Sequence, residues 1–309
     1  MEDELKIPFL NSDKKREPLS ARLMMIVSVA VWGTVGLFVK AIPLSSGEIA
    51  LWRAVLAVLL LSVIMLVTGR KIEFGKIKKE IFLLLISGVA IGINWVLLFE
   101  SYNYTTVSIA TLSYYFAPVI VMIACPLLFR ERLTAKQIIC FIGSTAGLVL
   151  ITGLGDPSAD GSHIKGILLA LGAALLYASD ILINKHIKNV DEISRTFLQF
   201  VASLTVLIPY VLLGGEINVL SLNASGWICL LTVGFIHTGV VYCMYFSSLV
   251  RLSGQKAAIL SYIDPLVAVL ISVIILKEPL SLTQAIGGAM ILAFTMFNEI
   301  KLKRKGDKL

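Results

Sequence analysis

An acidic residue and a helix-breaking proline lie side by side in the middle of an apolar stretch. Asp264 and Pro265 fall inside the mostly apolar run from Ala257 to Leu276. A carboxylate there could bind a cationic group or carry a proton, and Pro265 frees a backbone carbonyl around Leu260–Ser261 because proline has no N–H. The structural alternative is an acid capped by a neighbouring hydroxyl that only shapes the helix. We favour the chemical role, so Asp264 is the first candidate site residue.

Tyrosines flank this proline and a second one, Pro118, at a similar depth in their apolar stretches. They are Tyr114, Tyr115 and Tyr262. Aromatic rings with hydroxyl groups suit amphipathic or cationic metabolites, through stacking or cation–π contact, although ordinary helix packing also uses such residues. We therefore expect Pro118 and Pro265 to break their helices and the three tyrosines to line a substrate cavity.

Three more residues deep in apolar stretches are candidates for the same cavity: Trp32, Asn94 and Trp95. Trp32 lies too far inside its stretch for the aromatic belt at a membrane surface. A buried amide such as that of Asn94 must find hydrogen-bond partners, which another helix or a ligand would supply. Both alternatives stay open for Asn94 and Trp95.

His237 and Asp180 are candidates for proton coupling or gating. A histidine can titrate near neutral pH, but a neutral His237 that hydrogen-bonds across helices is the interpretation we favour. Asp180 comes near the end of its stretch, one turn before Lys185. A local ion pair or a gate is therefore favoured over a substrate contact.

Arg53 lies inside an apolar stretch, about two turns from its predicted outer end. An arginine there can extend its charged end toward the surface or pair with an acid, and Glu48 and Glu100 are predicted on the same side. We expect a structural or gating role for Arg53 rather than a substrate contact, with both glutamates exposed to water.

The composition shows which solvent these residues meet. The chain is 57% hydrophobic and 15% charged, with a mean hydropathy of +0.89, whereas soluble domains are about 45–50% apolar and about 25% charged. Long apolar segments recur along the chain, each near the roughly 20 residues that a bilayer requires. The sequence predicts an all-α polytopic membrane protein with ten transmembrane helices at 21–40, 47–68, 81–101, 105–128, 134–152, 164–185, 194–214, 226–248, 254–276 and 282–300.

Basic residues orient these spans. Of the 27 lysines and arginines, the predicted outer segments carry only Lys40, Lys165 and Lys277, and Arg53 lies within a span. All the others fall in the alternate segments, which the positive-inside rule places in the cytoplasm. We expect both termini to be cytoplasmic, with a polar tail at 1–19 and a basic tail at 301–309. The short tails favour a bacterial inner membrane.

The two proline-containing stretches are copies of one another. "YYFAPVIVMIACPLLFRERLTAKQ" begins at Tyr114 and "SYIDPLVAVLISVIILKEPLSLTQ" begins at Ser261. Aligned without gaps, Pro118 matches Pro265 and Glu131 matches Glu278, an internal duplication at about 147 residues. Each half then holds five spans, 20–152 and 164–300. Because five is odd, the second half is inverted, a recurrent plan in transporters that open to either side.

These motifs resemble the EamA repeat of the drug/metabolite transporter superfamily. The proline, the apolar run and the Glu-x-Leu-Thr or Glu-x-Leu-Ser turn occur in both halves, and Trp32–Gly33 and Trp52–Arg53 also fit. The resemblance covers about 20–300. It implies ten helices as two inverted five-helix repeats around a central cavity, and transport of small metabolites, amino acids or drugs.

The sequence therefore predicts a secondary active transporter of a small amino acid, amine or drug-like solute, working by alternating access and coupled to protons. A metabolite exchanger or facilitator without proton coupling is the alternative. A membrane receptor or scaffold, or a membrane-embedded enzyme, is more remote, because no catalytic constellation is found. No cofactor, metal site or nucleic-acid partner is predicted. Partners are the solute, the lipid bilayer and protons, and a monomer and a homodimer both stay open.

Overall fold

The computed structural model describes residues 19–299 apart from 71, 73, 79, 130–133, 153–160, 185, 188–189, 215–216, 250 and 253–259. Within this described part the regular elements are helices, and no strand occurs. The tails predicted at 1–19 and 301–309 lie outside it, except for Leu19. The all-helical class expected from the apolar composition is therefore what the described residues adopt.

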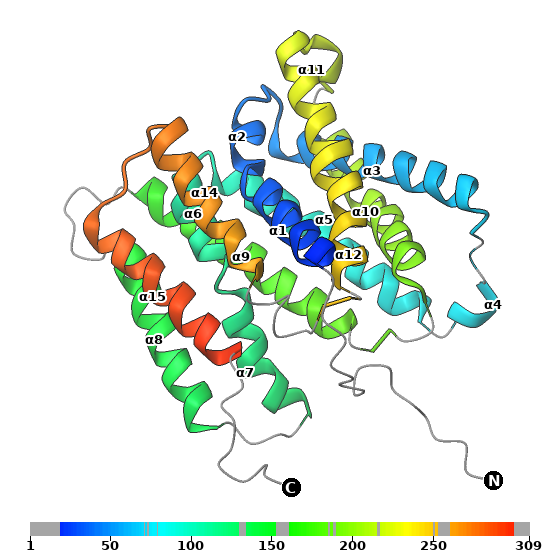
Figure 1. Ribbon diagram of the computed structural model, residues 1–309. Helices are drawn as coiled ribbons and strands as arrows, with labels where there is room; N and C mark the ends of the chain where they lie inside the picture. The colour runs from blue at the N-terminus through cyan, green and yellow to red at the C-terminus, as the bar shows by residue number, and fades with distance from the viewer. Residues whose placement is uncertain are drawn as a thin grey trace, which may run out of the picture.

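The first half of the chain forms the helices that come before residue 153 (Figure 1). In chain order these are α1 (Leu19–Gly33), α2 (Val35–Lys40), α3 (Ser46–Thr68), α4 (Phe74–Ile77), α5 (Ile81–Ser101), α6 (Val107–Tyr114), α7 (Ala117–Phe129) and α8 (Ala135–Thr152).

The second half forms the helices from residue 161 onward. These are α9 (Gly161–Asn184), α10 (Glu192–Gly214), η1 (Val219–Ser221), α11 (Ala224–Leu231), η2 (Thr232–Val240), α12 (Val241–Leu249), α14 (Ile263–Leu270), η3 (Ile271–Ile275) and α15 (Leu282–Glu299). η2 and η3 are π-helices, a form that occurs mostly in short pieces and often at functional sites.

Five helices in the described part are long and apolar enough to cross a membrane. They are Leu19–Lys40 (α1 and α2 together), Ser46–Thr68, Ile81–Ser101, Gly161–Asn184 and Ile193–Gly214. Shorter apolar helices of 10–17 residues lie in the other predicted spans, at Val107–Val121, Ala135–Ile151, Ala224–Val240, Ile263–Ile275 and Leu282–Asn298. The count of ten spans stays a prediction.

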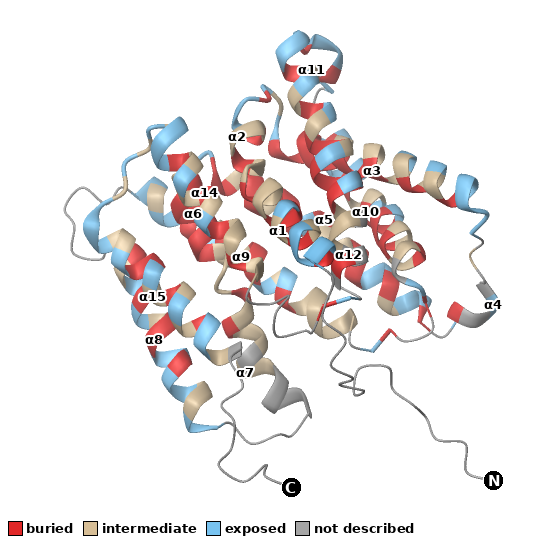
Figure 2. Cartoon of the chain, viewed as in Figure 1, coloured by how far each residue is buried: buried red, intermediate tan, exposed pale blue. Residues whose placement is uncertain are grey.

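Large apolar side chains cover the outward faces of these helices. Leu66, Val67 and Leu213 are each more than 80% exposed, while buried residues concentrate where the helices cross (Figure 2). An exposed apolar surface of this kind is costly in water but is favourable against lipid chains.

The helix contacts follow the same pattern when the two halves are exchanged. α5 of the first half packs on α9 and α10 of the second. Correspondingly, α12 of the second half packs on α1 of the first, and η2 of the second packs on α3 of the first. α6 and α7 pack on α9, as α14 packs on α1. α3 packs on α10, and α8 runs beside α15 (Figure 1). A two-fold axis that relates two five-helix units would produce this pattern.

Glycines allow α8 and α15 to pack closely against each other. A Cβ added to Gly147 would lie 2.6 Å from the backbone oxygen of Gly287, and one added to Gly287 would lie 2.5 Å from that of Gly147. Any larger residue at either position would force the helices apart. Each half therefore contributes one glycine, and the absence of a side chain on both glycines lets α8 and α15 pack together.

Both proline-containing spans are interrupted at matching positions. α6 ends at Tyr114 and α7 begins at Ala117, so that Pro118 lies in the first turn of α7. In the second half, α14 begins at Ile263, directly after Tyr262, and Pro265 lies in its first turn. Proline is tolerated in a first turn because the N–H groups there have no partner inside the helix.

Glu278 has a different structural role from the one its position suggests. An acid before a helix can complement the dipole of that helix, and Glu278 comes shortly before α15 in the chain. Instead its Oε2 accepts hydrogen bonds from the backbone N–H of Val107 at 2.8 Å and from the Ser272 hydroxyl at 2.5 Å. Its Oε1 also pairs with Lys40. Glu278 therefore joins α2 and α6 of one half to η3 of the other. Its counterpart Glu131 lies outside the described residues.

Candidate functional site

A cavity of about 270 Å³ lies between the two halves, beside both helix breaks. Its volume is just below the roughly 300–1,000 Å³ of pockets for drug-sized ligands, so it fits a smaller metabolite. Most of the residues expected to line a substrate cavity or to break a helix do line it: Trp32, Asn94, Trp95, Tyr114, Tyr115, Pro118, Tyr262 and Asp264.

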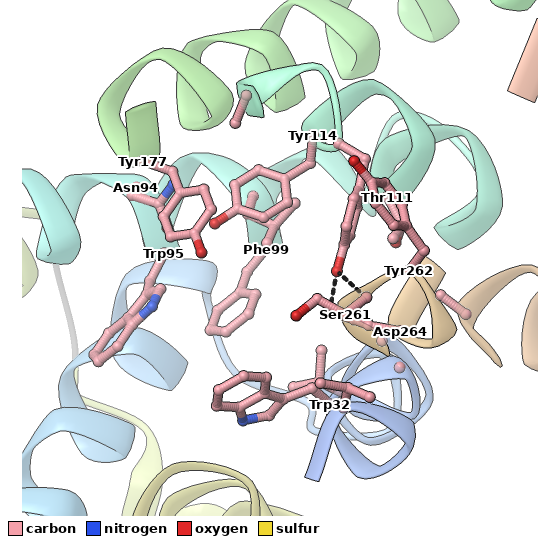
Figure 3. Close-up of a pocket in the computed structure, with 18 of the residues that line it drawn as sticks. Trp32, Asn94, Trp95, Phe99, Thr111, Tyr114, Tyr177, Ser261, Tyr262 and Asp264 are labelled. Carbon is pink, nitrogen blue, oxygen red and sulfur yellow. Dashed lines mark hydrogen bonds between the residues drawn. The ribbon is translucent and has the colours of Figure 1, made fainter. Parts of the chain in front are cut away.

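Asp264 forms one wall together with a tyrosine from the other half. The Tyr115 hydroxyl donates a hydrogen bond to Asp264 Oδ2 at 2.5 Å. The same hydroxyl lies 3.4 Å from the backbone oxygen of Ser261, and both contacts are dashed in Figure 3. The acid of the second break is thus held by the tyrosine of the first.

The Ser261 carbonyl is the one that Pro265 cannot engage. In a continuous helix the N–H of residue 265 would donate to the oxygen of residue 261, but proline has no N–H. The carbonyl therefore faces the Tyr115 hydroxyl across the halves. The helix break and the position of the hydroxyl have one physical origin.

A glycine of α1 allows this wall to form. A Cβ added to Gly33 would lie 2.6 Å from the backbone oxygen of Asp264 and equally close to the Cβ of Val267. α1 therefore passes against the second break with no side chain between them. The preceding residue, Trp32, projects into the cavity (Figure 3).

Arg53 of α3 lines the opposite side of the cavity, although it is only 7% exposed. Its Nε donates a hydrogen bond to the Thr238 hydroxyl at 2.7 Å, and its guanidinium carbon lies 4.3 Å from the centroid of the Trp95 ring. Figure 3 places Trp95 across the cavity from Asp264. Arg53 thus lies in the cavity lining, although a structural or gating role rather than a substrate contact was predicted for it from the sequence.

Of the two alternatives for Arg53, pairing with Glu48 or Glu100 does not occur in the described structure, because both acids have other partners. Glu48 is 2% exposed rather than wet. It accepts from the backbone N–H of Asn218 at 2.6 Å and caps α3 through Ser45. Glu100 accepts from the Ser46 hydroxyl at 2.7 Å.

Aromatic side chains line the cavity between the two charged residues. Trp32 contacts Tyr242 and Tyr245, with ring centroids 5.0 and 4.8 Å apart, and Tyr114 stacks on Tyr177 at 5.4 Å. These partners, and further lining residues such as Phe99, Tyr102 and Thr111, were not predicted from the sequence. One available signal was the position of Tyr177, Tyr242 and Tyr245 inside spans rather than at their ends.

His237 lies outside the cavity lining and hydrogen-bonds across helices. Its Nε2 is 2.9 Å from the Thr34 hydroxyl, between α1 and α2, and its Nδ1 is 3.2 Å from the backbone oxygen of Thr232. Its own carbonyl accepts from Trp32 Nε1 at 2.7 Å. These contacts match the role favoured for His237, a histidine that hydrogen-bonds across helices. The bond to its carbonyl also orients Trp32, which lines the cavity.

Asp180 also lies outside the cavity lining, one residue before Ile181, which lines it. It accepts hydrogen bonds from the Ser87 hydroxyl at 2.5 Å and from the Asn184 amide at 2.8 Å, and Gln199 lies within 3.4 Å. This cluster joins α5, α9 and α10. The partner expected for Asp180, Lys185, lies outside the described residues.

The composition of the cavity lining suits the binding of a polar solute. Among the described residues no group of three His, Cys, Asp or Glu side chains could hold a metal ion. The described lining combines one acid, one arginine, tyrosine hydroxyls and apolar surface. Such a lining can hold and release a polar solute while excluding most water.

Both halves match one protein family. The model of the EamA-like transporter family matches residues 19–153 and again residues 164–298. A Bacillus subtilis (strain 168) protein named uncharacterized transporter YxxF is 33% identical over 97% of this chain and 95% of its own length. Protein PecM of Dickeya dadantii (strain 3937) is 24% identical over 74% of this chain and 76% of its own.

A solved crystal structure has the same fold. It covers 90% of this chain, and the chain covers 96% of it, with a TM-score of 0.60 and 16% sequence identity. At that identity the likeness concerns the fold alone.

Proposed function

Because this chain belongs to the EamA-like transporter family, we propose that it is a secondary transporter that carries a small metabolite through the cavity. It is an all-helical, multi-pass membrane protein, and two relatives from Bacillus subtilis are named uncharacterized transporters. The proposed solute is an amino acid, an amine or another small molecule with a cationic group.

The observation that carries the proposal is the hydrogen bond from Tyr115 to Asp264 in the cavity wall. It joins the helix break of one half to the acid of the other, inside a space of metabolite size. An ionisable residue within a membrane span is costly and typically marks a substrate or ion pathway. A solute or a proton that binds Asp264 competes with Tyr115 and loosens the contact between the halves.

Alternating access is the proposed transport mechanism, with ten spans arranged as two inverted repeats. The helix contacts support it, because they match when the two halves are exchanged. Two similar halves can exchange their conformations, so that the cavity opens to one side of the membrane and then to the other. The basic residues of the alternate segments support cytoplasmic termini in a bacterial inner membrane.

Proton coupling is the proposed energy source, through Asp264. A carboxyl group that binds a proton in one arrangement and the solute in the other would couple the two gradients. An exchanger that needs solute on the far side is the alternative, and His237 and Asp180 would then serve only to hold their helices.

Uptake into proteoliposomes tests the proposal. A mixed pool of labelled amino acids and small amines is supplied with and without an outward proton gradient, acidic inside the vesicles, because a proton and a solute that alternate at Asp264 move in opposite directions. We expect gradient-dependent accumulation that falls by about tenfold or more in Asp264→Asn, since a hydrogen bond to a charged group contributes about 1.5–3 kcal/mol. Asp191→Asn is the control, because Asp191 is paired with Arg70 at the surface.

Each other outcome has a definite meaning. Equal uptake without the gradient contradicts proton coupling and supports exchange or facilitated diffusion. Full activity in Asp264→Asn contradicts the role of Asp264. Absence of uptake for every solute in the pool contradicts the proposed solute class.

A further inference from the structure

The cavity has one charged residue of each sign, on opposite sides. Among its described lining residues, Arg53 is the only basic side chain and Asp264 is the only acidic one. Arg53 lies over the Trp95 ring, and Figure 3 shows Trp95, Asn94 and Tyr177 facing Ser261 and Asp264 across the open space. An acid alone would suit a simple amine, so the arginine requires its own explanation.

Arg53 keeps most of its hydrogen-bonding capacity unused in the described structure. A guanidinium group has five N–H donors, and only its Nε has a partner there, the Thr238 hydroxyl. The rings of Trp95 and Phe99, 4.3 and 5.6 Å from the guanidinium carbon, stabilise the charge but accept no strong hydrogen bond. No acid among the described residues forms an ion pair with it.

A buried charge of this kind needs a partner. Removing an ion from water costs several kcal/mol unless an opposite charge and hydrogen bonds compensate, and arginine stays protonated in proteins. Thr238 and two aromatic rings compensate only in part. The missing partner is an anion that approaches from the cavity, because Arg53 borders open space on that side.

We propose that Arg53 is an anion subsite and that the transported solute carries both a carboxylate and an ammonium group. This inference deepens the transport function proposed above and depends on it. The carboxylate binds the guanidinium of Arg53, the ammonium binds Asp264, and the body of the solute rests on the tyrosine and tryptophan rings between them.

Charge balance favours such a zwitterion over an ion of either sign. Arg53 and Asp264 cancel one another when both are ionised, so a solute without net charge leaves the site neutral. A simple amine would pair with Asp264 and leave Arg53 unpaired, and a simple acid would leave Asp264 unpaired. An unpaired buried charge discriminates strongly against such an analogue.

The planar fork of arginine binds carboxylate and phosphate groups alike. The single guanidinium in the described lining balances one negative charge, which favours the carboxylate. A phosphonate analogue of the solute distinguishes the two, because it has the same ammonium group and a larger anion of higher charge.

The test is a set of matched ligands added to the purified full chain in detergent, with binding measured by calorimetry. One series is L-leucine, isopentylamine and 4-methylpentanoate, and a second is L-phenylalanine, phenethylamine and 3-phenylpropanoate. A third is 4-aminobutanoate, propylamine and butanoate, with more widely spaced charges. Aminomethylphosphonate is compared with glycine.

We expect the zwitterion of at least one series to bind about tenfold or more tightly than both of its singly charged analogues. An amine that binds as tightly as its zwitterion in every series overturns the proposal, and so does the absence of binding in all of them. Tighter binding of aminomethylphosphonate than of glycine transfers the subsite to phosphate-like anions and overturns the carboxylate assignment.

Variants assign the effect to Arg53. Arg53→Gln should remove the preference for the zwitterion over the amine, and Arg53→Lys should retain part of it. Arg70→Gln, which removes an exposed arginine paired with Asp191, should leave it unchanged. Thermal unfolding checks that each variant is folded. The ligand series on the unaltered chain decides the proposal even if Arg53→Gln does not fold.

Binding in detergent needs no gradient, so failure of proton coupling leaves this result intact. Gradient-driven uptake of amines without binding of any zwitterion would retain the transport function and reject the inference. The two proposals therefore fail separately.

Discussion

The break before α7 and the break before α14 have the same order of residues. A tyrosine and an apolar residue precede the third position, and proline follows it: Tyr115 to Pro118 in one half and Tyr262 to Pro265 in the other. Both tyrosines line the cavity. The third position differs, because it is Ala117 in the first half and Asp264 in the second.

The surroundings of these two positions differ as well. Ala117 also borders the cavity, but it is 1% exposed and packs against Ala174 and Ala178 of α9. Asp264 faces α1 at Gly33 and receives the Tyr115 hydroxyl. Proline and tyrosine therefore belong to the shared construction of the repeat, whereas the acid is an addition to one copy.

Ala117→Asp gives the largest expected effect. A carboxylate placed against Ala174 and Ala178 has no partner among them, and an acid at the centre of a span costs about 2.5–3.5 kcal/mol on insertion scales. We expect a large loss of folded protein, measured by fluorescence-detected gel filtration in detergent, and no transport when Ala117→Asp is combined with Asp264→Ala. Transport by that double variant would show that the two breaks are interchangeable.

Tyr115→Phe gives an intermediate effect. The variant keeps the ring but removes the hydroxyl that donates to Asp264, which contributes about 1.5 kcal/mol, or close to tenfold. Gradient-driven uptake should fall by about that factor. Tyr114→Phe, whose ring stacks on Tyr177, is the control and should fall less. Equal losses would mean that the hydroxyl contact with Asp264 has no special role.

The proline variants give the smallest effect and the sharpest test of equivalence. Because each proline lies in a first turn, alanine fits without strain and chiefly restores freedom to the unfolded chain, worth about 0.4–1 kcal/mol. Pro118→Ala and Pro265→Ala should therefore lower the thermal unfolding midpoint in detergent by similar amounts. A clearly larger shift for Pro265→Ala would tie that proline to the acid beside it.

Much of this architecture could be predicted locally. Apolar runs of membrane length predicted the helices, and the duplicated proline motif predicted both the family and the positions of the two breaks. The interruption of the first span at Thr34, between α1 and α2, was not predicted. No proline marks it, and the Thr34 hydroxyl, which donates to the Val31 carbonyl at 2.7 Å, is an unspecific signal.

The sequence by itself determined the solvent, the helices and the duplication, because hydrophobicity and the missing N–H of proline act within a few residues of where they occur. Only the tertiary structure decided which polar side chains face one another. Arg53 faces the cavity rather than Glu48 or Glu100 because of how α3 is rotated against η2. Asp264 meets Tyr115, 149 residues away, because the two halves pack together at their breaks. Rotation and packing of helices depend on distant partners, and no local pattern encodes them.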